Sequence, residues 1–279
     1  MDLSLRVGRA FSPEKTESGP SLKLPVIVGK QPAVMQIEQT CLDPPVLNVW
    51  STQSVRKDVL KSVAEWVVLS ELNLVPFYSI SEKHKKLGPI ISRLYGLKHL
   101  RPATIFEMAV IAVTEQQISL AAAYRIRHRL VERFGRKIES FWLFPTPAVL
   151  SDAPLQELTS CGLSLRKAGY IKDLSMAVSD GRLDLESTKR MDDDNVRNFI
   201  EGQRGFGRWS ANYILIRGLG RPDAVPSDDL GIRTILGYYL GDGSRMSPAQ
   251  VEESLEQFRP YRGLAMFYFL ADWRLSKAR

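Results

Sequence analysis

Hydrophobic and polar positions follow two different periodicities along this chain. In the first fifty residues apolar side chains alternate with polar ones at 3–7, at 22–28 and at 35–37, and the short apolar run PVLNVW follows at 45–50. A period of two predicts strands with one buried face. Turn-forming inserts such as SPEKTESGPS separate these runs, so we expect a small antiparallel sheet.

Helical spacing begins near residue 55. Apolar residues then recur at the three- and four-residue intervals of one helix face, at Val55, Val59, Leu60, Val63, Trp66 and Val67. A second helix is expected from about 81 to 95. We therefore predict an N-terminal α+β domain with an antiparallel sheet over residues 1–98.

From Pro102 onward the pattern predicts helices alone, separated by short segments that contain Gly, Pro or Asp. The expected helices are 104–113, 118–134, 154–160, 166–178, 193–201, 208–219, 229–240, 248–257 and 261–275. No internal repeat suggests a solenoid. The fold class is therefore predicted to be mainly α, with an all-helical region over 99–279.

Composition excludes several classes of protein. The 44% hydrophobic and 25% charged residues are typical of a globular chain, and no apolar run approaches the roughly 18 residues of a membrane span. The N-terminus lacks the apolar stretch of a secretory signal, so we expect an intracellular protein. Two cysteines, Cys41 and Cys161, and three scattered histidines predict neither a disulfide framework nor a metal site.

The net charge of +7 and pI near 9.4 favour a polyanionic partner such as nucleic acid. On the helix expected at 118–134, Arg125, Arg129 and Arg133 form a basic stripe beside the apolar edge of Ile126 and Leu130. An ordinary solvated surface would give the same pattern, so charge alone leaves both interpretations open.

The stretch RGFGRWSAN at 204–212 combines a glycine kink with positive charge. Gly205 and Gly207 can adopt positive φ and let the backbone approach another surface closely. The following helix would point free N–H groups at an anion, to which Arg204 and Arg208 would add charge. The alternative is a plain turn between packed helices.

A second candidate segment, PSDDLGI, begins at Pro226. Pro226 interrupts any preceding helix, and Ser227 or Asp228 is a natural N-cap for the next one. Asp229 would then lie in the first turn, where a carboxylate can stabilise a cationic transition state or orient a water. Alternatively, both carboxylates could lie there only because negative charge is favourable at a helix N-terminus.

Taken together, the hairpin and the following Pro/Asp loop resemble those of the helix-hairpin-helix DNA glycosylases, most closely the 3-methyladenine DNA glycosylase II (AlkA-like) branch. The resemblance covers about residues 104–275, where four further blocks of sequence occur in the same order as in the family. These blocks are TEQQISLAAAYRIRHRLVERFG at 114–135, FPTPAVL at 144–150, GLSLRKAGYI at 162–171 and FRPYRGLA at 258–265.

The resemblance implies an architecture and a chemistry. Residues 108–225 would carry the helix-hairpin-helix, 226–279 with 99–107 would form a second helical subdomain, and the active site would lie in the cleft between them. Asp229 matches the family's catalytic aspartate. Trp209 occupies the position that is lysine in the strand-cleaving branch, so a monofunctional glycosylase without AP-lyase activity is expected.

The resemblance also assigns DNA-binding roles. The hairpin residues Arg204, Gly205, Gly207, Arg208 and Ser210 would bind phosphate. Trp209 and Tyr213, four residues apart, would form the walls of a pocket for a flipped, cationic alkylated base.

The resemblance implies further roles in the same way. Gln117 or Ile118 would wedge into the DNA, and Leu270 stands where broad-range members often place a further pocket aromatic, with Phe267, Tyr268 and Trp273 nearby. The expected partner is double-stranded DNA that contains damaged bases, bound by a monomer in the cytoplasm or nucleoid if the source is prokaryotic. No cofactor is expected beyond a structural monovalent cation at the hairpin carbonyls.

Two alternatives stay open at this point. A related glycosylase could act on deaminated or oxidised bases, and a non-catalytic damage sensor could keep the hairpin and the basic helix.

Overall fold

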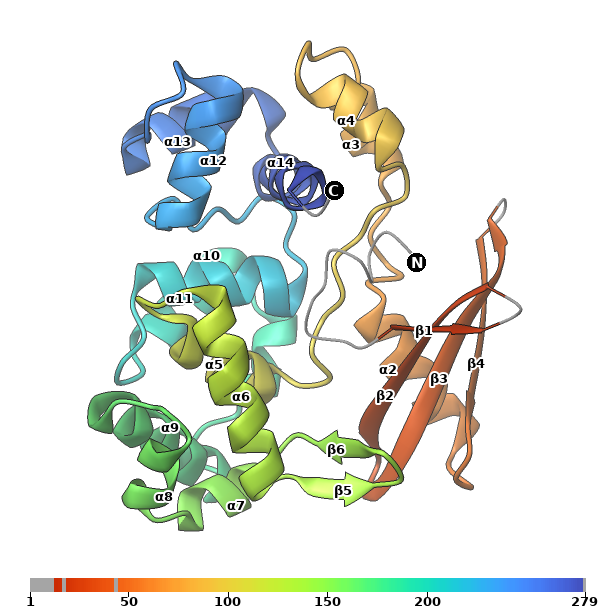
Figure 1. The fold of residues 1–279 in the computed structure, drawn as a ribbon, viewed down its shortest axis with the longest axis vertical. Helices are drawn as coiled ribbons and strands as arrows, with labels where there is room; N and C mark the ends of the chain where they lie inside the picture. The colour runs from red at the N-terminus through yellow and green to blue at the C-terminus, as the bar shows by residue number, and fades with distance from the viewer. Residues whose placement is uncertain (1–12, 17–18, 43–44, 278–279) are drawn as a thin grey trace.

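The computed structural model describes residues 13–16, 19–42 and 45–277, and its first structural unit is a twisted antiparallel sheet (Figure 1). The sheet order is β1 (Pro13–Thr16), β2 (Gly19–Val28), β3 (Gln31–Leu42) and β4 (Pro45–Ser51). The predicted sheet is confirmed, while the strand expected at 3–7 lies outside the described residues. Residues 13–16 and 19–21 of the insert SPEKTESGPS form β1 and the start of β2, because pairing with a neighbour outweighs weak strand propensity.

One face of the sheet packs on α2 (Lys57–Val67), and together they form a small hydrophobic core. Leu22, Leu24, Val26 and Val28 alternate along β2 and are buried, as the period-two pattern predicted. From α2 the buried residues are Leu60, Ala64 and Val67.

The prediction of one helix over 81–95 is wrong. The structure has two short helices instead, α3 (Val75–Ser81) and α4 (Leu87–Arg93). The side chain of His84 starts the second helix: its Nδ1 accepts hydrogen bonds from the N–H groups of Lys86 (3.3 Å) and Leu87 (3.1 Å). The residues of α3 and α4 belong to the large helical core. The helical core thus includes buried residues from Leu74 to Leu97, while Leu100 packs with the sheet core.

Ten α-helices and one strand pair follow in the described chain. The α-helices are α5 (Ile105–Glu115), α6 (Leu120–Phe134), α7 (Pro147–Asp152), α8 (Leu155–Ser160), α9 (Leu165–Ser179), α10 (Asp193–Glu201), α11 (Arg208–Ile214), α12 (Leu230–Leu240), α13 (Pro248–Leu255) and α14 (Arg262–Ser276). The strand pair β5 (Arg136–Ile138) and β6 (Phe141–Leu143) completes them as a hairpin. Short 3₁₀ turns cover Leu185–Arg190 and Glu256–Phe258, and a π-helical turn covers Leu215–Leu219.

The mainly α fold class is confirmed, with two local differences. The β5–β6 hairpin was not expected after residue 99, because strands of three residues are too short to show alternation. The helix α7 was also missed, although Thr146 caps it and Pro147 opens it.

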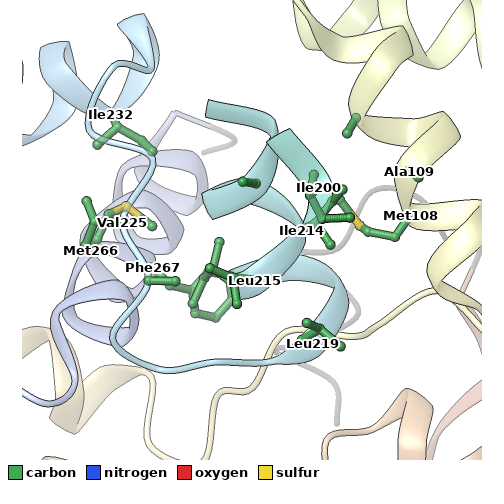
Figure 2. Packing of buried hydrophobic residues seen from close by; sticks show 14 of the residues in the cluster. Met108, Ala109, Ile200, Ile214, Leu215, Leu219, Val225, Ile232, Met266 and Phe267 are labelled. Atoms are coloured by element: carbon green, nitrogen blue, oxygen red, sulfur yellow. The ribbon is translucent and has the colours of Figure 1, made fainter. Parts of the chain in front are cut away.

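The large core joins the helices that carry the site. Ile214 and Leu215 of α11 and its extension pack between Met108 of α5 and Phe267 of α14 (Figure 2). Since each of these side chains is at most 4% exposed, α5, α11 and α14 are fixed relative to one another. None of the helices in the described ranges combines the length and hydrophobicity that a bilayer crossing requires.

Candidate active site

The hairpin between α10 and α11 uses its two glycines differently. Gly205 has a φ of +90°, and a Cβ there would meet the ring of Tyr170 at 2.3 Å. Gly207 has an extended φ of −129°, so of the two hairpin glycines Gly205 alone uses the positive φ that both permit. A Cβ at Gly207 would have no heavy atom within 4 Å. The fold therefore requires the first glycine, whereas the second leaves the hairpin backbone open to an external surface.

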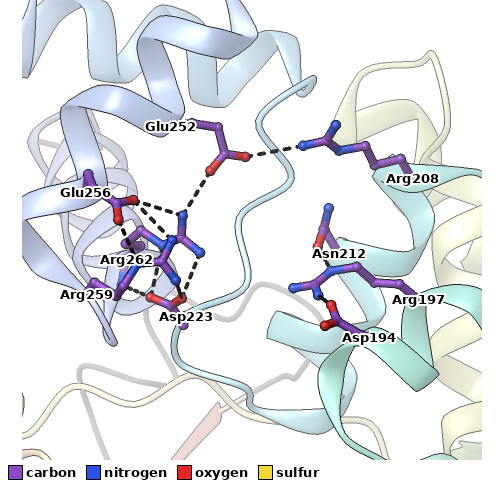
Figure 3. Close-up of polar contacts among 9 residues, drawn as sticks. All are labelled: Asp194, Arg197, Arg208, Asn212, Asp223, Glu252, Glu256, Arg259 and Arg262. Carbon is purple, nitrogen blue, oxygen red and sulfur yellow. Dashed lines mark hydrogen bonds and ion pairs between the residues drawn. The ribbon is translucent and has the colours of Figure 1, made fainter.

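Both hairpin arginines contact carboxylates of neighbouring helices. Arg204 forms an ion pair with Asp173 and lies over the ring of Tyr170 at 5.5 Å. Arg208 reaches Glu252 on α13, with 3.7 Å between Nη2 and Oε1 (Figure 3). The two arginine side chains are still 69% and 65% exposed, so a phosphate could compete for both.

Asp229 is itself the N-cap of α12, which corrects the assignment of that role to Ser227 or Asp228. Its Oδ1 accepts hydrogen bonds from the N–H groups of Gly231 (2.8 Å) and Ile232 (3.0 Å). Asp229 is the N-cap because its backbone is extended and the helical residues begin directly after it, at Leu230. Ser227 is buried and Asp228 is exposed.

The second oxygen of Asp229 contacts the aromatic pair. Trp209 Nε1 donates to Asp229 Oδ2 at 3.0 Å, and the rings of Trp209 and Tyr213 stack with centroids 4.9 Å apart and planes at 18°. Residues 20 positions apart in the sequence thus place a carboxylate at the edge of a double aromatic wall. Such a wall can stack a flat heterocycle beside a fixed negative charge.

A buried network holds the other end of the wall, and no sequence pattern had indicated it. The hydroxyl of Tyr213 donates to Glu115 Oε2 at 2.5 Å, and the other oxygen of Glu115 pairs with Arg127. Burial first, and then the charge of Glu115, raise the pKa of Tyr213, so the phenol keeps its proton. Arg127 is therefore not part of the exposed stripe formed by Arg125, Arg129 and Arg133.

The loop between α5 and α6 is tied to the hairpin. Gln116 Nε2 donates to Gly205 O (2.8 Å) and to Ser210 Oγ (3.1 Å). Ser210 is 2% exposed, so its hydroxyl is engaged inside the protein. The wedge candidates Gln117 and Ile118 lie in this loop, where Gln117 has a φ of +55° and Ile118 is 39% exposed. Both candidates therefore point away from the core beside the hairpin; Gln116 was missed as the residue that holds them there.

A cavity of about 690 Å³ opens beside Tyr213, between the sheet and the helical core. Leu270 and Phe267 of α14 line it, whereas Tyr268 is buried with its hydroxyl on Leu97 O and Trp273 packs against Tyr238. Glu107 also lines the cavity, and burial raises the pKa of its carboxyl to about 7.

Two of the hairpin carbonyl oxygens that could bind a cation already accept hydrogen bonds. The Gly205 carbonyl already accepts the amide of Gln116, and Gln203 O accepts the N–H of Phe206 at 3.1 Å. A monovalent cation bound by these two carbonyls would share each oxygen with an N–H donor. In the described part of the chain, no group of three or more His, Cys, Asp or Glu side chains could hold a metal ion.

Comparison with protein families gives a match over more than half of the chain. The model of the HhH-GPD superfamily base excision DNA repair proteins matches residues 110–260, a range that contains the hairpin, Trp209, Tyr213 and Asp229.

Individual relatives agree with that match. The DNA-3-methyladenine glycosylase of Bacillus subtilis is 28% identical over 224 residues, which are 79% of this chain and 73% of that protein. DNA-3-methyladenine glycosylase 2 of Escherichia coli is 29% identical over 197 residues, 69% and 67% of the two chains. Among solved structures, the 3-methyladenine DNA glycosylase from Archaeoglobus fulgidus superposes with a TM-score of 0.84 at 21% identity, covering 98% and 94% of the chains.

Proposed function

The chain belongs to the HhH-GPD superfamily of base excision DNA repair proteins, and we propose that it is a monofunctional DNA glycosylase that releases alkylated bases of the 3-methyladenine and 7-methylguanine type. The named relatives support the alkylated-base class. The observation that carries the proposal is the hydrogen bond of 3.0 Å between Trp209 Nε1 and Asp229 Oδ2. It places one carboxylate beside a wall on which a flipped base can stack.

The reaction follows from this geometry. An alkylated base flips out of the duplex, enters the pocket and stacks on the rings of Trp209 and Tyr213. As the N-glycosidic bond breaks, its electrons leave with the base and positive charge develops on the sugar. The carboxylate of Asp229 stabilises that charge and orients the water that adds to the sugar, which leaves an abasic site. We propose no metal ion or organic cofactor for these steps, and a monovalent cation at the hairpin only as a structural element.

The absence of strand cleavage is part of the proposal. A lyase reaction requires an amine that forms a Schiff base with the sugar, and the hairpin offers the indole of Trp209 at the relevant position. Its ring nitrogen is a hydrogen-bond donor and not a nucleophile. Borohydride reduction during turnover should therefore trap no covalent protein–DNA adduct.

DNA binding is assigned to the hairpin and the adjoining loop. Open space beside Gly207 lets a phosphate approach the backbone, and Arg204 and Arg208 flank it. Gln117 or Ile118 fills the gap that the flipped base leaves in the stack. We propose that a monomer acts in this way on damaged duplex DNA inside the cell.

Asp229→Asn tests the catalytic assignment. Asparagine is an equally good N-cap, so α12 should stay folded while the charge is lost. We expect base release from methylated duplex DNA to fall by roughly a hundredfold or more, with DNA affinity retained. Release would be measured by chromatography of the freed bases.

Asp228→Asn is the matched control, because Asp228 is the exposed neighbour in the same loop. It should retain full activity. Release by Asp229→Asn within about threefold of wild type would contradict the proposal, and undetectable release by the wild-type protein from any lesion would favour the non-catalytic damage sensor.

A further inference from the structure

A lysine of α9 contacts the C-terminal end of α5. Lys167 Nζ donates hydrogen bonds to Thr114 O at 3.1 Å and to Gln116 O at 2.6 Å. The last turn of α5 contains no basic residue, so the lysine supplies from another helix the positive charge that a helix C-terminus favours. Burial first, and then the charge of Arg166, lower the pKa of Lys167, so its ammonium group is partly withdrawn from water. The two carbonyl oxygens replace that water as acceptors.

One of these carbonyl groups belongs to the peptide group that joins Gln116 to Gln117, in the loop 116–119 between α5 and α6, here called the wedge loop. Gln117 has a φ of +55°, in the left-handed region that residues with a Cβ rarely adopt. Such a conformation persists only where the surrounding structure holds it. Lys167 holds the peptide group directly before the strained residue, and so maintains the conformation of the loop that carries the wedge candidates Gln117 and Ile118.

The wedge loop is also fixed to the hairpin. The side-chain amide of Gln116 donates to Gly205 O at 2.8 Å and to Ser210 Oγ at 3.1 Å. The main-chain carbonyl of the same residue accepts from Lys167. Gln116 therefore joins the wedge loop to α9 on one side and to the hairpin on the other.

The same face of α9 contacts the hairpin directly. Tyr170 and Asp173 follow Lys167 at intervals of three residues, so the three side chains lie along one side of the helix. The ring of Tyr170 packs against the backbone of Gly205, and Asp173 pairs with Arg204. One helix face thus holds both the wedge loop and the hairpin.

We propose that Lys167 is a positioning residue that holds the wedge loop in its strained conformation and at a fixed position relative to the hairpin before DNA binds. The inference rests on the proposed glycosylase function. A preformed wedge enters the gap left by a flipped base without the loss of conformational freedom that ordering a mobile loop would cost, so the flipped state is stabilised. The alternative role, a direct contact of Lys167 with DNA phosphate, predicts a different result in the test.

The test measures how strongly the protein prefers a duplex with a gap. Fluorescence anisotropy would compare a duplex that contains a tetrahydrofuran abasic analogue with the same duplex fully paired, because only the first offers a gap to the wedge. In Lys167→Met the ratio of the two affinities should fall about tenfold, while the affinity for the paired duplex changes by less than about twofold. A ratio does not depend on the fraction of folded protein, so a less stable variant still gives a valid result.

Lys172→Met is the matched control. Lys172 also lies on α9 and donates to a main-chain carbonyl, Ala153 O at 2.7 Å, but this carbonyl lies between α7 and α8 and not in the wedge loop. The control should leave the ratio unchanged. Gln116→Met breaks the connection between the wedge loop and the hairpin, and should lower the ratio as Lys167→Met does.

The outcomes separate this inference from the proposed function. An unchanged ratio in Lys167→Met would overturn the inference, and equal weakening of both duplexes would also overturn it, because Lys167 would then act on DNA phosphate. Base release from methylated duplex in a single turnover with saturating protein is measured separately, and should fall about tenfold in Lys167→Met. If the wild-type protein released no base while Lys167→Met still lowered the ratio, the glycosylase activity would be refuted and the positioning role would stand.

Discussion

Trp209 donates its indole N–H to Oδ2 of Asp229 at 3.0 Å, while Oδ1 of the same carboxylate caps α12. One aspartate therefore starts a helix and holds the edge of the aromatic wall. The arrangement fixes the distance between the proposed stacking surface and the proposed catalytic carboxylate.

Replacing Trp209 by phenylalanine separates these two roles. The aromatic face is kept and the N–H is lost, so Oδ2 loses the donor that orients it. We expect base release to fall by roughly tenfold and the free energy of unfolding by about 1 kcal/mol. Urea denaturation and chromatography of released bases would check both values. Trp50→Phe, in the sheet, should change neither, and full activity in Trp209→Phe would show that the hydrogen bond is dispensable.

Changing the two hairpin glycines to alanine should have different effects, on stability at Gly205 and on DNA affinity at Gly207. Gly205→Ala forces a side chain into positive φ and into the ring of Tyr170, so it should destabilise the protein by about 1–3 kcal/mol. Gly207→Ala fits an extended φ and open space, so the melting temperature should hold while affinity for any duplex falls. Unaltered DNA binding by folded Gly207→Ala would argue against a phosphate at this point.

Asp173 should act as a competitor for DNA phosphate, because it pairs with Arg204. Asp173→Asn frees the arginine, and we expect the affinity for duplex DNA to rise about threefold to tenfold at low salt. Asp180→Asn, which breaks the exposed pair with Arg182, is the matched control and should have no effect.

The arginines themselves should determine the salt dependence of binding. Replacing both Arg204 and Arg208 by alanine should weaken binding to every sequence and lower the slope of log affinity against log salt by about two, one for each lost contact. Fluorescence anisotropy over a range of salt concentrations would measure this slope. An unchanged slope would mean that these arginines do not contact phosphate.

The carboxyl of Glu107 should make stability depend on pH. Its ordinary pKa is 4.5 and burial raises it to about 7 in the folded protein. The folded state therefore binds more protons than the unfolded state between these values, and the free energy of unfolding should fall as pH rises from about 4.5 through 7.

Glu107→Gln should remove this dependence. It should match wild type near pH 5 and exceed it by about 1–2 kcal/mol near pH 8, a value reduced because the cavity admits water. Urea denaturation at the two pH values would measure the difference, with Glu201→Gln, on the exposed end of α10, as control. Parallel pH profiles for wild type and Glu107→Gln would contradict the prediction.

Local patterns predicted most of the elements but not all of their details. Alternation located β2 and β3, and helical spacing located α5, α6, α9, α10 and α12 to within a few residues. The split of residues 75–93 into two helices escaped prediction because a side chain, His84, supplies the break. The N-cap was placed one or two residues too early because Ser227, Asp228 and Asp229 all have capping side chains, and only backbone conformation selects among them.

The sequence by itself determined the hairpin, the helix that begins at Asp229 and the spacing of Trp209 and Tyr213, because each depends on residues within a turn or two of one another. Tertiary structure alone decided that Glu115 meets Tyr213, 98 positions away, and that Lys167 reaches the carbonyl of Gln116. The physical reason is that burial and charge at the site arise where α5, α6, α9, α11 and α14 pack together. No local pattern specifies which side chains such packing brings together.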